Sequence, residues 1–454
     1  MEIARKYPGQ WIRADRDHLL NILPGSPEPW FVAVQPGSWG GEVYHQRRIL
    51  DDGQLVFLVN YSLDEQARGT IRMKGEEALC LNPSSGNIYK YPAEKNDSLI
   101  SISFTLHPAG SLLLFVPDDR PEGSWPEPES MIPAEVMPLD GNLSVKPRSP
   151  NVLTLDYCYL NLGENKEELL YFIRAAEMIY SHHGIQGNPW FRTIQFKKNI
   201  LEKDSFGPGS GFRARFPFRI AENMNTAGLQ VVVERAHLYV VSVNGQKVEP
   251  LPNRWWLDKQ FGVFDIGAYT GQGWNEIGVE ASPMSIHCEL EPVYILGDFS
   301  LIPADSGFII CPPQPLTTGS WKAQGMPFYP DVVEYTGTFS AVKKAGGYLL
   351  SMGQWNGTVA SVRVNGKEAG LIYTPPYEKD ISSYVRTGKN EVSVLVYGSL
   401  KNLLGPHHQK ERQGEVSPWS FRNAPALQPA GDQYDLLDYG LFEEFTVRTL
   451  EKQE

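Results

Sequence analysis

Residues 241–245 read Val-Ser-Val-Asn-Gly, and residues 362–366 read Val-Arg-Val-Asn-Gly. Each phrase is followed by Asp-Ile and then by Gly-x-Asn-Glu-(Ile/Val), at 265–266 and 273–277 in the first case and at 380–381 and 388–392 in the second. In both copies the second Asn lies ten positions after the Asp. A repeat this regular predicts two copies of one domain along the chain.

The repeated phrase has the chemistry of a β-hairpin. Valines at alternate positions place one face of a strand against a core, because side chains along a strand alternate between two faces. Asn-Gly then supplies the positive φ angles of a tight turn. Phe218 and Phe339 also keep their offset, since each precedes the turn asparagine by 26 residues. We therefore expect an all-β fold of tandem β-sandwich or jelly-roll domains with one inserted helix.

Length and composition are those of an ordinary globular chain. The 454 residues suggest about three domains of roughly 150 residues each. Hydrophobic residues make up 41% and charged residues 21%, which gives enough apolar material for several cores. The net charge of −12 disfavours nucleic acid and anionic membranes as partners, because both repel an acidic surface.

The sequence leaves the cellular location open between periplasmic or extracellular and cytoplasmic. The first residues contain no apolar stretch of a signal peptide, and no run approaches the roughly 18 apolar residues of a membrane helix. The four cysteines lie far apart beside apolar residues, at Cys80, Cys158, Cys288 and Cys311. This favours buried free thiols, with one or two disulfides as the alternative in an oxidising compartment.

Turn signals and proline content divide the chain into five expected segments. They are an N-terminal segment at 1–40, a small antiparallel sandwich at 41–117, a proline-rich linker at 118–150, a first jelly roll at 151–300 and a second at 301–454. Proline lacks the amide donor of a sheet ladder, so the linker is expected to be an extended strap rather than a sheet. Residues 1–40 lack periodicity and read as the tail of a missing catalytic domain.

One segment, 166–183, has helical rather than strand periodicity. Apolar residues recur at i, i+3, i+4 and i+7 from Leu169 to Tyr180. Glu167 and Glu168 suit the first turn of a helix, and Gly184 suits its C-terminal cap. We expect a helix inserted in the first jelly roll.

The repeated phrases resemble the galactose-binding-like jelly-roll domains of large glycoside hydrolases. Flanking phrases, including Tyr-Ile-Leu-Gly-Asp-Phe at 294–299 and Tyr-Thr-Gly-Thr-Phe at 335–339, are similar to the C-terminal half of α-L-rhamnosidase-type enzymes of glycoside hydrolase family 106. The resemblance implies a non-catalytic portion that buttresses a catalytic barrel and binds glycan. Its implied partners are an oligo- or polysaccharide and a catalytic domain of the same or another chain.

The catalytic barrel of such enzymes is not expected in this chain. A barrel alternates strands and helices over about 250 residues, and the sequence has no such pattern. No catalytic residue is therefore assigned. Glu289 and Glu291 would share one face of a strand, and glycoside hydrolysis needs two carboxylates, but a solvated strand edge is the favoured explanation of this spacing.

The expected binding residues lie where the two repeats differ. Trp255 and Trp256 occupy an expansion in the first repeat, where 21 residues rather than 15 separate the turn asparagine from the aspartate. Their flat rings suit a sugar platform or a domain interface. Asn402, His407 and His408 form a polar loop after the second repeat that could face a sugar or a neighbouring domain. Adjacent histidines lack the third ligand of a metal site, so no metal or cofactor is expected, and a structural calcium ion stays open.

Two other functions remain open from the sequence. One is a stand-alone carbohydrate-binding protein with no enzyme attached. The other is a complete glycosidase or polysaccharide lyase whose site lies between the β-domains. Fold alone does not choose among them, since function lies in particular sites.

Overall fold

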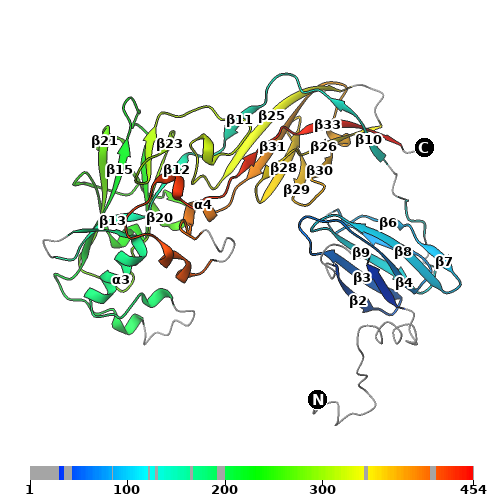
Figure 1. The fold of residues 1–454 in the computed structure, drawn as a ribbon, viewed down its shortest axis with the longest axis horizontal. Helices are drawn as coiled ribbons and strands as arrows, with labels where there is room; N and C mark the ends of the chain where they lie inside the picture. The colour runs from blue at the N-terminus through cyan, green and yellow to red at the C-terminus, as the bar shows by residue number, and fades with distance from the viewer. Residues whose placement is uncertain are drawn as a thin grey trace, which may run out of the picture. The chain divides into compact units, whose positions relative to one another are not determined.

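The computed structural model describes residues 30–34, 43–83, 85–120, 123–127, 131–163, 167–191, 200–341, 346–409 and 416–452. These residues form an all-β protein of layered, mostly antiparallel sheets (Figure 1). Two compact units make up the chain: the first comprises Met1–Pro133, Thr374–Glu378 and Leu450–Glu454, and the second Ala134–Tyr373 and Lys379–Thr449. The all-β sandwich fold expected from the repeat is confirmed.

The first unit contains a small sandwich of two sheets, ordered β1-β4-β8-β7 and β2-β3-β9-β5-β6. The strands are β1 (Phe31–Val34), β2 (Val43–Ile49), β3 (Gly53–Asn60), β4 (Ala67–Lys74), β5 (Ala78–Leu81), β6 (Ile88–Tyr91), β7 (Glu94–Asn96), β8 (Leu99–Leu106) and β9 (Ser111–Pro117). Alternate residues of β4 and β8, such as Ile71 and Ile102, fill its core. Strand β1 pairs with β4, so this part of the segment 1–40 belongs to the sandwich. Residues 1–29 and 35–40 lie outside the described residues.

The first jelly roll forms a larger sandwich in the second unit. Its sheets are ordered β12-β22-β16-β20-β19 and β14-β13-β15-β21-β17-β18, with β24 added to β15 and β23 to β24. The strands are β12 (Asn151–Leu155), β13 (Tyr157–Asn161), β14 (Glu168–Tyr171), β15 (Phe212–Ile220), β16 (Gln230–Glu234), β17 (Val240–Val243), β18 (Gln246–Val248), β19 (Trp255–Trp256), β20 (Asp258–Asp265), β21 (Gly273–Ala281), β22 (Val293–Gly297), β23 (Ser300–Pro303) and β24 (Phe308–Cys311). One continuous apolar core fills this sandwich.

The second jelly roll has sheets ordered β11-β25-β31-β28-β29 and β10-β33-β26-β30, and a separate pair β27-β32. The strands are β10 (Met131–Met137), β11 (Ser144–Pro147), β25 (Val332–Ala341), β26 (Gly347–Ser351), β27 (Trp355–Asn356), β28 (Val359–Val364), β29 (Lys367–Ile372), β30 (Glu378–Asp380), β31 (Gly388–Tyr397), β32 (Gly440–Leu441) and β33 (Thr446–Lys452). The expectation of an unpaired strap at 118–150 is wrong for β10 and β11. Both are edge strands, where the missing donors of Pro133 and Pro147 cost little.

Helices are few and short. The α-helices are α3 (Phe172–His182) and α4 (Lys401–Leu404), and the 3-10 helices are η2 (Pro189–Phe191), η4 (Leu201–Lys203), η5 (Ala236–Leu238), η6 (Gly267–Tyr269), η7 (Lys322–Gln324), η8 (Ser382–Tyr384), η10 (Pro418–Asn423) and η11 (Gly431–Gln433). Among the described residues, no helix combines the length and the apolar composition required to cross a membrane. The four cysteines are buried and free, which decides between the two alternatives for their state.

The inserted helix is shorter than its sequence pattern suggests. Residues Glu168–Tyr171 form strand β14, which pairs with β13, so α3 has no acidic residue in its first turn. The expected start near 166, itself outside the described residues, is therefore wrong: sheet pairing overrides the local helical pattern. Gly184 has a φ of 80° just after the helix, as expected of a C-terminal cap.

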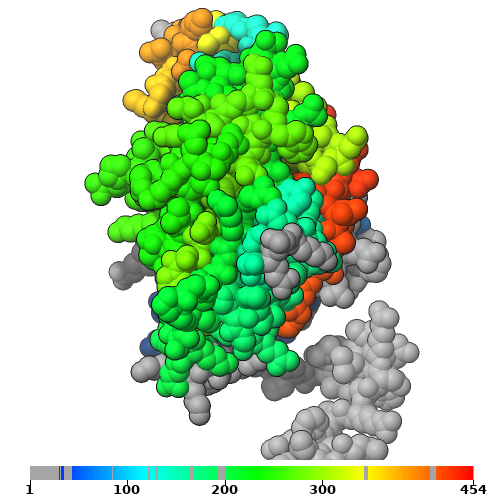
Figure 2. Space-filling view, turned by 90° about the vertical axis from the view of Figure 1, so that its left-hand side faces the viewer, coloured from blue at the N-terminus to red at the C-terminus, as the bar shows by residue number. Residues whose placement is uncertain are grey.

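The C-terminal segment, by which we mean residues 401–409 and 416–445, packs along the first sandwich. Figure 2 shows this face, with green residues of the first sandwich over most of it and red residues of the C-terminal segment beside them. The hydroxyl of Tyr157 donates to the carbonyl of Pro425, and Nη2 of Arg174 donates to the carbonyl of Ala424, both at 2.9 Å. Residues far apart in sequence therefore hold the second unit together.

Each repeat phrase builds an asparagine clasp, our name for the pairs Asn244–Asn275 and Asn365–Asn390. In the first clasp, Nδ2 of Asn244 donates to Oδ1 of Asn275 at 2.9 Å, and the amide of Glu276 donates to Oδ1 of Asn244 at 3.0 Å. Nδ2 of Asn275 donates to the carbonyls of Gly271 and Gly273 at 2.7 and 3.1 Å. The side chains therefore satisfy backbone groups at the ends of β17 and β21.

The second clasp repeats this pattern. Nδ2 of Asn365 donates to Oδ1 of Asn390 at 2.8 Å, and Nδ2 of Asn390 donates to the carbonyls of Arg386 and Gly388 at 2.7 and 2.8 Å. The two turn asparagines have φ values of 50° and 52°, and the glycines after them 79° and 77°. The hairpin turn expected of Asn-Gly is confirmed, and the buried second asparagine explains why the ten-residue spacing recurs in each copy.

Candidate functional site

The two tryptophans of the expanded loop lie in different environments. They form β19, which pairs with β20 at the edge of the five-stranded sheet. Trp255 keeps 54% of its surface exposed. Trp256 packs its ring against Phe261 and Tyr294, with centroids 6.5 and 5.5 Å apart. Trp256 thus extends the core, and a sugar platform at Trp255 stays a prediction.

Asn402, His407 and His408 are buried inside the second unit rather than presented on a surface loop. Asn402 and His407 are each 2% exposed, and the side chain of His408 is 6% exposed. Asn402 exchanges hydrogen bonds of 2.9 Å with the backbone of Leu437, and its carbonyl lies 2.8 Å from Nε2 of His407. These side chains join chain segments. Their sugar-binding role stays a prediction, and it would require them to leave these partners.

Both histidines face Asp156, whose side chain is fully buried between β12 and β13. Oδ2 of Asp156 lies 3.5 Å from Nδ1 of His407 and 3.5 Å from Nε2 of His408, and the hydroxyl of Tyr434 donates to Oδ1 at 2.9 Å. Burial works to raise the pKa of Asp156, but the two imidazoles outweigh it and hold this pKa below its ordinary value. This Asp156 cluster ties the first sandwich to the C-terminal segment.

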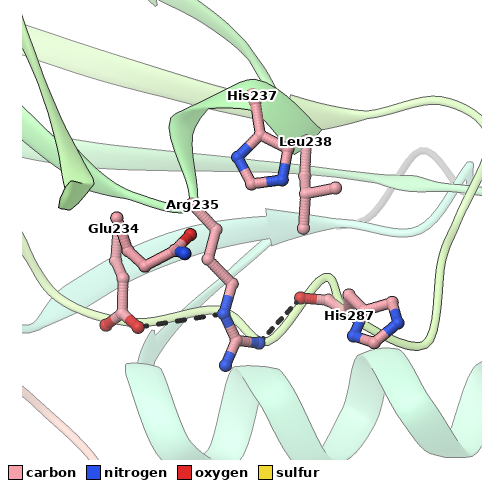
Figure 3. A pocket seen from close by; sticks show the side chains of 6 residues that line it. Glu234, Arg235, His237, Leu238 and His287 are labelled. Atoms are coloured by element: carbon pink, nitrogen blue, oxygen red, sulfur yellow. Dashed lines mark hydrogen bonds and ion pairs between the residues drawn. The ribbon is translucent and has the colours of Figure 1, made fainter.

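A pocket of about 420 Å³ opens where strand β16 ends (Figure 3). We call it the Arg235 pocket, and it is lined by Glu234, Arg235, His237, Leu238, Gln260 and His287. Glu234 is the last residue of β16, Arg235 joins β16 to η5, and Gln260 comes from β20. His287 lies in the loop that precedes β22. Three segments distant in sequence therefore meet around one hollow.

Arg235 is the central side chain of this pocket. Its backbone has φ 48° and ψ 41°, the left-handed region that is strained for a residue with a side chain. Its amide donates to the carbonyl of Gln260 at 2.7 Å, and Nη1 donates to the carbonyl of His287 at 3.1 Å. The guanidinium lies over the Trp190 ring, 5.5 Å from its centroid. The strained turn and these contacts fix the guanidinium at the pocket wall. Figure 3 shows its links to Glu234 and His287.

Carboxyl groups lie around this guanidinium, but at the outer limit of ion-pair distance. Oε1 of Glu234 lies 3.9 Å from Nε of Arg235, and Oε2 of Glu289 lies 4.0 Å from Nη1. Burial raises the pKa of Glu234 and of Glu289, although Asn188 donates to Glu289 at 2.8 Å and opposes the rise there. Burial also raises the pKa of Glu291 well above its ordinary value, and repulsion from Glu289 and Glu234 adds to it.

The arrangement offers donors and acceptors in one small volume. A guanidinium, a carboxylate, a carboxamide and two imidazoles can hydrogen-bond hydroxyl groups of a ligand from several sides. Protonated carboxyl groups, which the raised pKa values of Glu289 and Glu291 favour, can also donate hydrogen bonds. Within the part of the chain that the structure describes, no group of three or more His, Cys, Asp or Glu residues is placed to hold a metal ion.

Of the residues in and around this pocket, the sequence points only to Glu289 and Glu291. The expectation that Glu289 and Glu291 share a strand face at a solvated edge is wrong, because both lie in the loop between β21 and β22 and Glu289 is largely buried. The two carboxyl groups are nevertheless electrostatic neighbours. The sequence does not point to Glu234 and Arg235. Their only signal is that a run of three valines ends in Glu-Arg, and strands often end in charged residues. The left-handed turn at Arg235 orients its side chain toward the pocket. Because arginine rarely adopts a positive φ, the sequence does not predict this turn.

Comparisons with known proteins assign no family to the chain. No protein-family model matches it, and no curated protein matches it. Solved structures do match. The rhamnosidase from Novosphingobium sp. PP1Y is 13% identical, with 99% of this chain and 28% of that chain covered and a TM-score of 0.42.

Two further solved structures have lower scores. The α-L-rhamnosidase from Streptomyces avermitilis is 13% identical over 85% of this chain and 35% of that chain, with a TM-score of 0.24. The β-D-mannosidase from Dictyoglomus thermophilum is 10% identical over 55% of this chain and 31% of that chain, with a TM-score of 0.23. The chain spans about a third or less of the length of these proteins. Likenesses of this size carry no functional argument, so the chain's own residues must supply it.

Proposed function

We propose that the protein is a non-catalytic β-sandwich portion of a carbohydrate-active glycoside hydrolase and binds a neutral oligosaccharide in the Arg235 pocket. The observation that carries the binding proposal is this pocket of about 420 Å³ with a fixed guanidinium at its wall. A volume of this order suits a small ligand, since ligand pockets typically span about 300–1,000 Å³. The link to an enzyme comes from the resemblance of the repeated phrases to accessory domains of glycoside hydrolases.

The lining groups favour hydroxyl-rich ligands. Arg235 can donate two parallel hydrogen bonds to neighbouring hydroxyls, while Glu234 accepts and Gln260 does both. The apolar side chain of Leu238 can cover a C–H face of a sugar ring. A neutral ligand is favoured because Glu234 and Glu289 lie 3.9 and 4.0 Å from the single guanidinium and compete with an anionic ligand for it.

Calorimetric titration against a panel of rhamnosides, galactosides and their oligomers tests the proposal. At least one neutral oligosaccharide is expected to bind at up to millimolar concentration, and Arg235→Gln should weaken this binding about tenfold, since a hydrogen bond to a charged group contributes about 1.5–3 kcal/mol. Arg213→Gln is the matched control, because Arg213 is exposed on the same sandwich and pairs with Glu280 at 3.5 Å outside the pocket. Absence of binding across the panel would remove the binding role proposed for the Arg235 pocket.

Hydrolysis within this chain is a second candidate, favoured by one observation. The pKa values of Glu289 and Glu291 are both raised, and a raised pKa favours the protonated form that a general acid needs. Release of nitrophenol from aryl rhamnosides and galactosides checks this candidate. Activity that disappears in Glu289→Gln and in Glu291→Gln, and persists in the surface control Glu280→Gln, would replace the non-catalytic proposal.

A further inference from the structure

The first sandwich has a second pocket, of about 390 Å³, on the outer side of its larger sheet. We call it the Trp274 pocket. Its polar and aromatic lining consists of Thr154, Phe218, Arg219, Trp274, Asp305, Ser306, Phe308, Gln428 and Tyr434. It shares none of its lining residues with the Arg235 pocket. The floor comes from β15 and β21, and the walls come from β12, β24, the β23–β24 loop and the C-terminal segment.

Strand register places an aromatic ring beside a cation on this floor. Arg219 of β15 is the direct partner of Trp274 on β21, and Ile309 of β24 is its partner on the other side. Directly paired residues of neighbouring strands project from the same face of a sheet. Trp274 is 69% exposed, which leaves most of its indole surface open. The result is a flat ring next to a guanidinium, with an apolar side chain on the far flank.

Arg219 differs from the other arginines on its face of β15. Arg213 lies 3.5 Å from Glu280, and Arg215 forms ion pairs with both Glu276 and Glu167. Of the described residues, none places a carboxylate within 4.0 Å of Arg219. Trp274 lies directly across from Arg219, whereas acidic Glu280 lies directly across from Arg213. The guanidinium is thus a cation available to an external anion.

The pocket wall is ordered by hydrogen bonds that reach into the core. Ser306 donates to Oε1 of Gln428 at 3.2 Å, and Nε2 of Gln428 donates to the hydroxyl of Tyr434 at 3.2 Å. Tyr434 in turn donates to buried Asp156. Gly307 permits this approach, because a Cβ at that position would lie 2.6 Å from Nε2 of Gln428. The wall is therefore preorganised before any ligand arrives.

We propose that the Trp274 pocket binds an acidic sugar, a pyranose ring that carries a carboxylate. The indole of Trp274 covers the C–H face of the ring, since aromatic rings present a large apolar surface. Arg219 pairs with the carboxylate through charge-assisted hydrogen bonds, for which its planar guanidinium is suited. Asp305, Ser306 and Gln428 are in place to hydrogen-bond the ring hydroxyls. This site goes beyond the proposed function, which concerns a neutral ligand in a different pocket.

The test is calorimetric titration of the intact chain with tetragalacturonate and, as the neutral counterpart, β-1,4-galactotetraose. The wild type should bind the acidic oligomer at least about tenfold more tightly than the neutral one in this pocket, and raising the salt concentration should weaken that binding. Arg219→Gln and Trp274→Ala should each reduce the affinity for tetragalacturonate about tenfold. Both side chains are exposed, so folding should be unaffected, which the unfolding temperature checks.

Two variants separate this proposal from the neutral-ligand proposal. Arg213→Gln, on the same strand but paired, and Arg235→Gln, in the other pocket, should both leave tetragalacturonate binding unchanged. Unchanged affinity in Arg219→Gln would overturn the proposal, as would loss of binding in Arg235→Gln. Equal affinity of the wild type for both oligomers, with no response to salt, would also overturn it. Failure of neutral oligosaccharides to bind the Arg235 pocket alters none of these outcomes.

Discussion

The two sandwiches of the second unit share their asparagine clasps but differ in the chain segment after one strand. Strands β16 and β26 occupy the same place in the two copies. The amide of Ile266 donates to the carbonyl of Leu229, just before β16, and the amide of Ile381 donates to Tyr348 in β26, both at 2.9 Å. After β16 the chain turns through Arg235 and leaves the Arg235 pocket open. After β26 the chain instead forms hydrogen bonds with the C-terminal segment.

The C-terminal segment covers the second copy at this place. The amide of Gln354 donates to Oε2 of Glu443 at 3.1 Å, and its carbonyl accepts from the amide of Phe442 at 2.8 Å. Strand β27 then pairs with β32. Gly353 permits the close approach, since a Cβ there would lie 2.6 Å from Cβ of Glu443. The comparison shows that the repeated jelly roll has a pocket after this strand only in the copy where the C-terminal segment does not cover it.

The largest effect is expected from a substitution that breaks the link between the first sandwich and the C-terminal segment. Asp156→Asn should lower the free energy of unfolding by about 3 kcal/mol at pH 7, because it leaves His407, His408 and Tyr434 around a neutral amide. The matched control is Asp140→Asn, since Asp140 lies exposed between β10 and β11, the corresponding place in the second sandwich. That change should stay within about 0.5 kcal/mol in denaturant unfolding.

The Asp156 contribution also has a defined pH dependence. The pKa of Asp156 is lowered in the folded state, so its contribution is complete above the unfolded pKa of about 3.9 and is lost as the pH falls through the lower, folded value. The difference in stability between wild type and Asp156→Asn should therefore shrink below about pH 4. A difference that grows on acidification would contradict this account of the cluster.

The next effect tests whether the clasps are equivalent. Asn275→Ala and Asn390→Ala should each cost about 2–3 kcal/mol of stability, because each leaves two backbone carbonyls and the partner asparagine without their hydrogen bonds. Asn96→Ala, at an exposed position of β7, is the control and should be nearly neutral. Chemical denaturation measures all three. A large loss of stability from one substitution and none from the other would show that the two clasps do not stabilise their sandwiches equally.

The smallest effect concerns the carboxyl group of Glu291 in the first sandwich. Glu291 has a raised pKa in the folded state, so its ionisation destabilises the fold increasingly as the pH rises above the unfolded value of about 4.3. Glu291→Gln should therefore raise the unfolding temperature by about 2 °C at pH 7 to 8 and give no gain at pH 4. Thermal unfolding at the two pH values checks this, with Glu280→Gln as the exposed control. A gain that is equal at both pH values would contradict the pKa direction.

The sequence could predict the features that local chemistry determines. Asn-Gly requires a turn with positive φ, and alternating valines require a half-buried strand, so the two hairpins could be predicted directly from residues 241–245 and 362–366. Edge strands are harder, because the prolines of β10 and β11 argue against a sheet unless the strand lies at its edge. The start of α3 is misplaced for a similar reason, since only the neighbouring strand β13 shows that residues 168–171 are extended.

The sites depend on contacts that no local pattern encodes. His407 and His408 read as a surface loop, because nothing nearby in sequence indicates that Asp156, about 250 residues earlier, pairs with them. Arg219 and Trp274 become neighbours only through the register of β15 and β21. The idea that mismatches between the copies carry function stays a prediction, and the structure moves its best candidate from the Trp255–Trp256 loop to the turn at Arg235.

Hydrogen–deuterium exchange with and without the tightest-binding neutral oligosaccharide tests the central claim that one framework binds ligand only where it is left open. Peptides that cover residues 234–238 and His287 are expected to exchange more slowly with ligand present. Peptides that cover residues 351–357, the covered place in the second sandwich, are expected to be unchanged. Equal slowing in both sandwiches, or slowing in the second alone, would contradict the account.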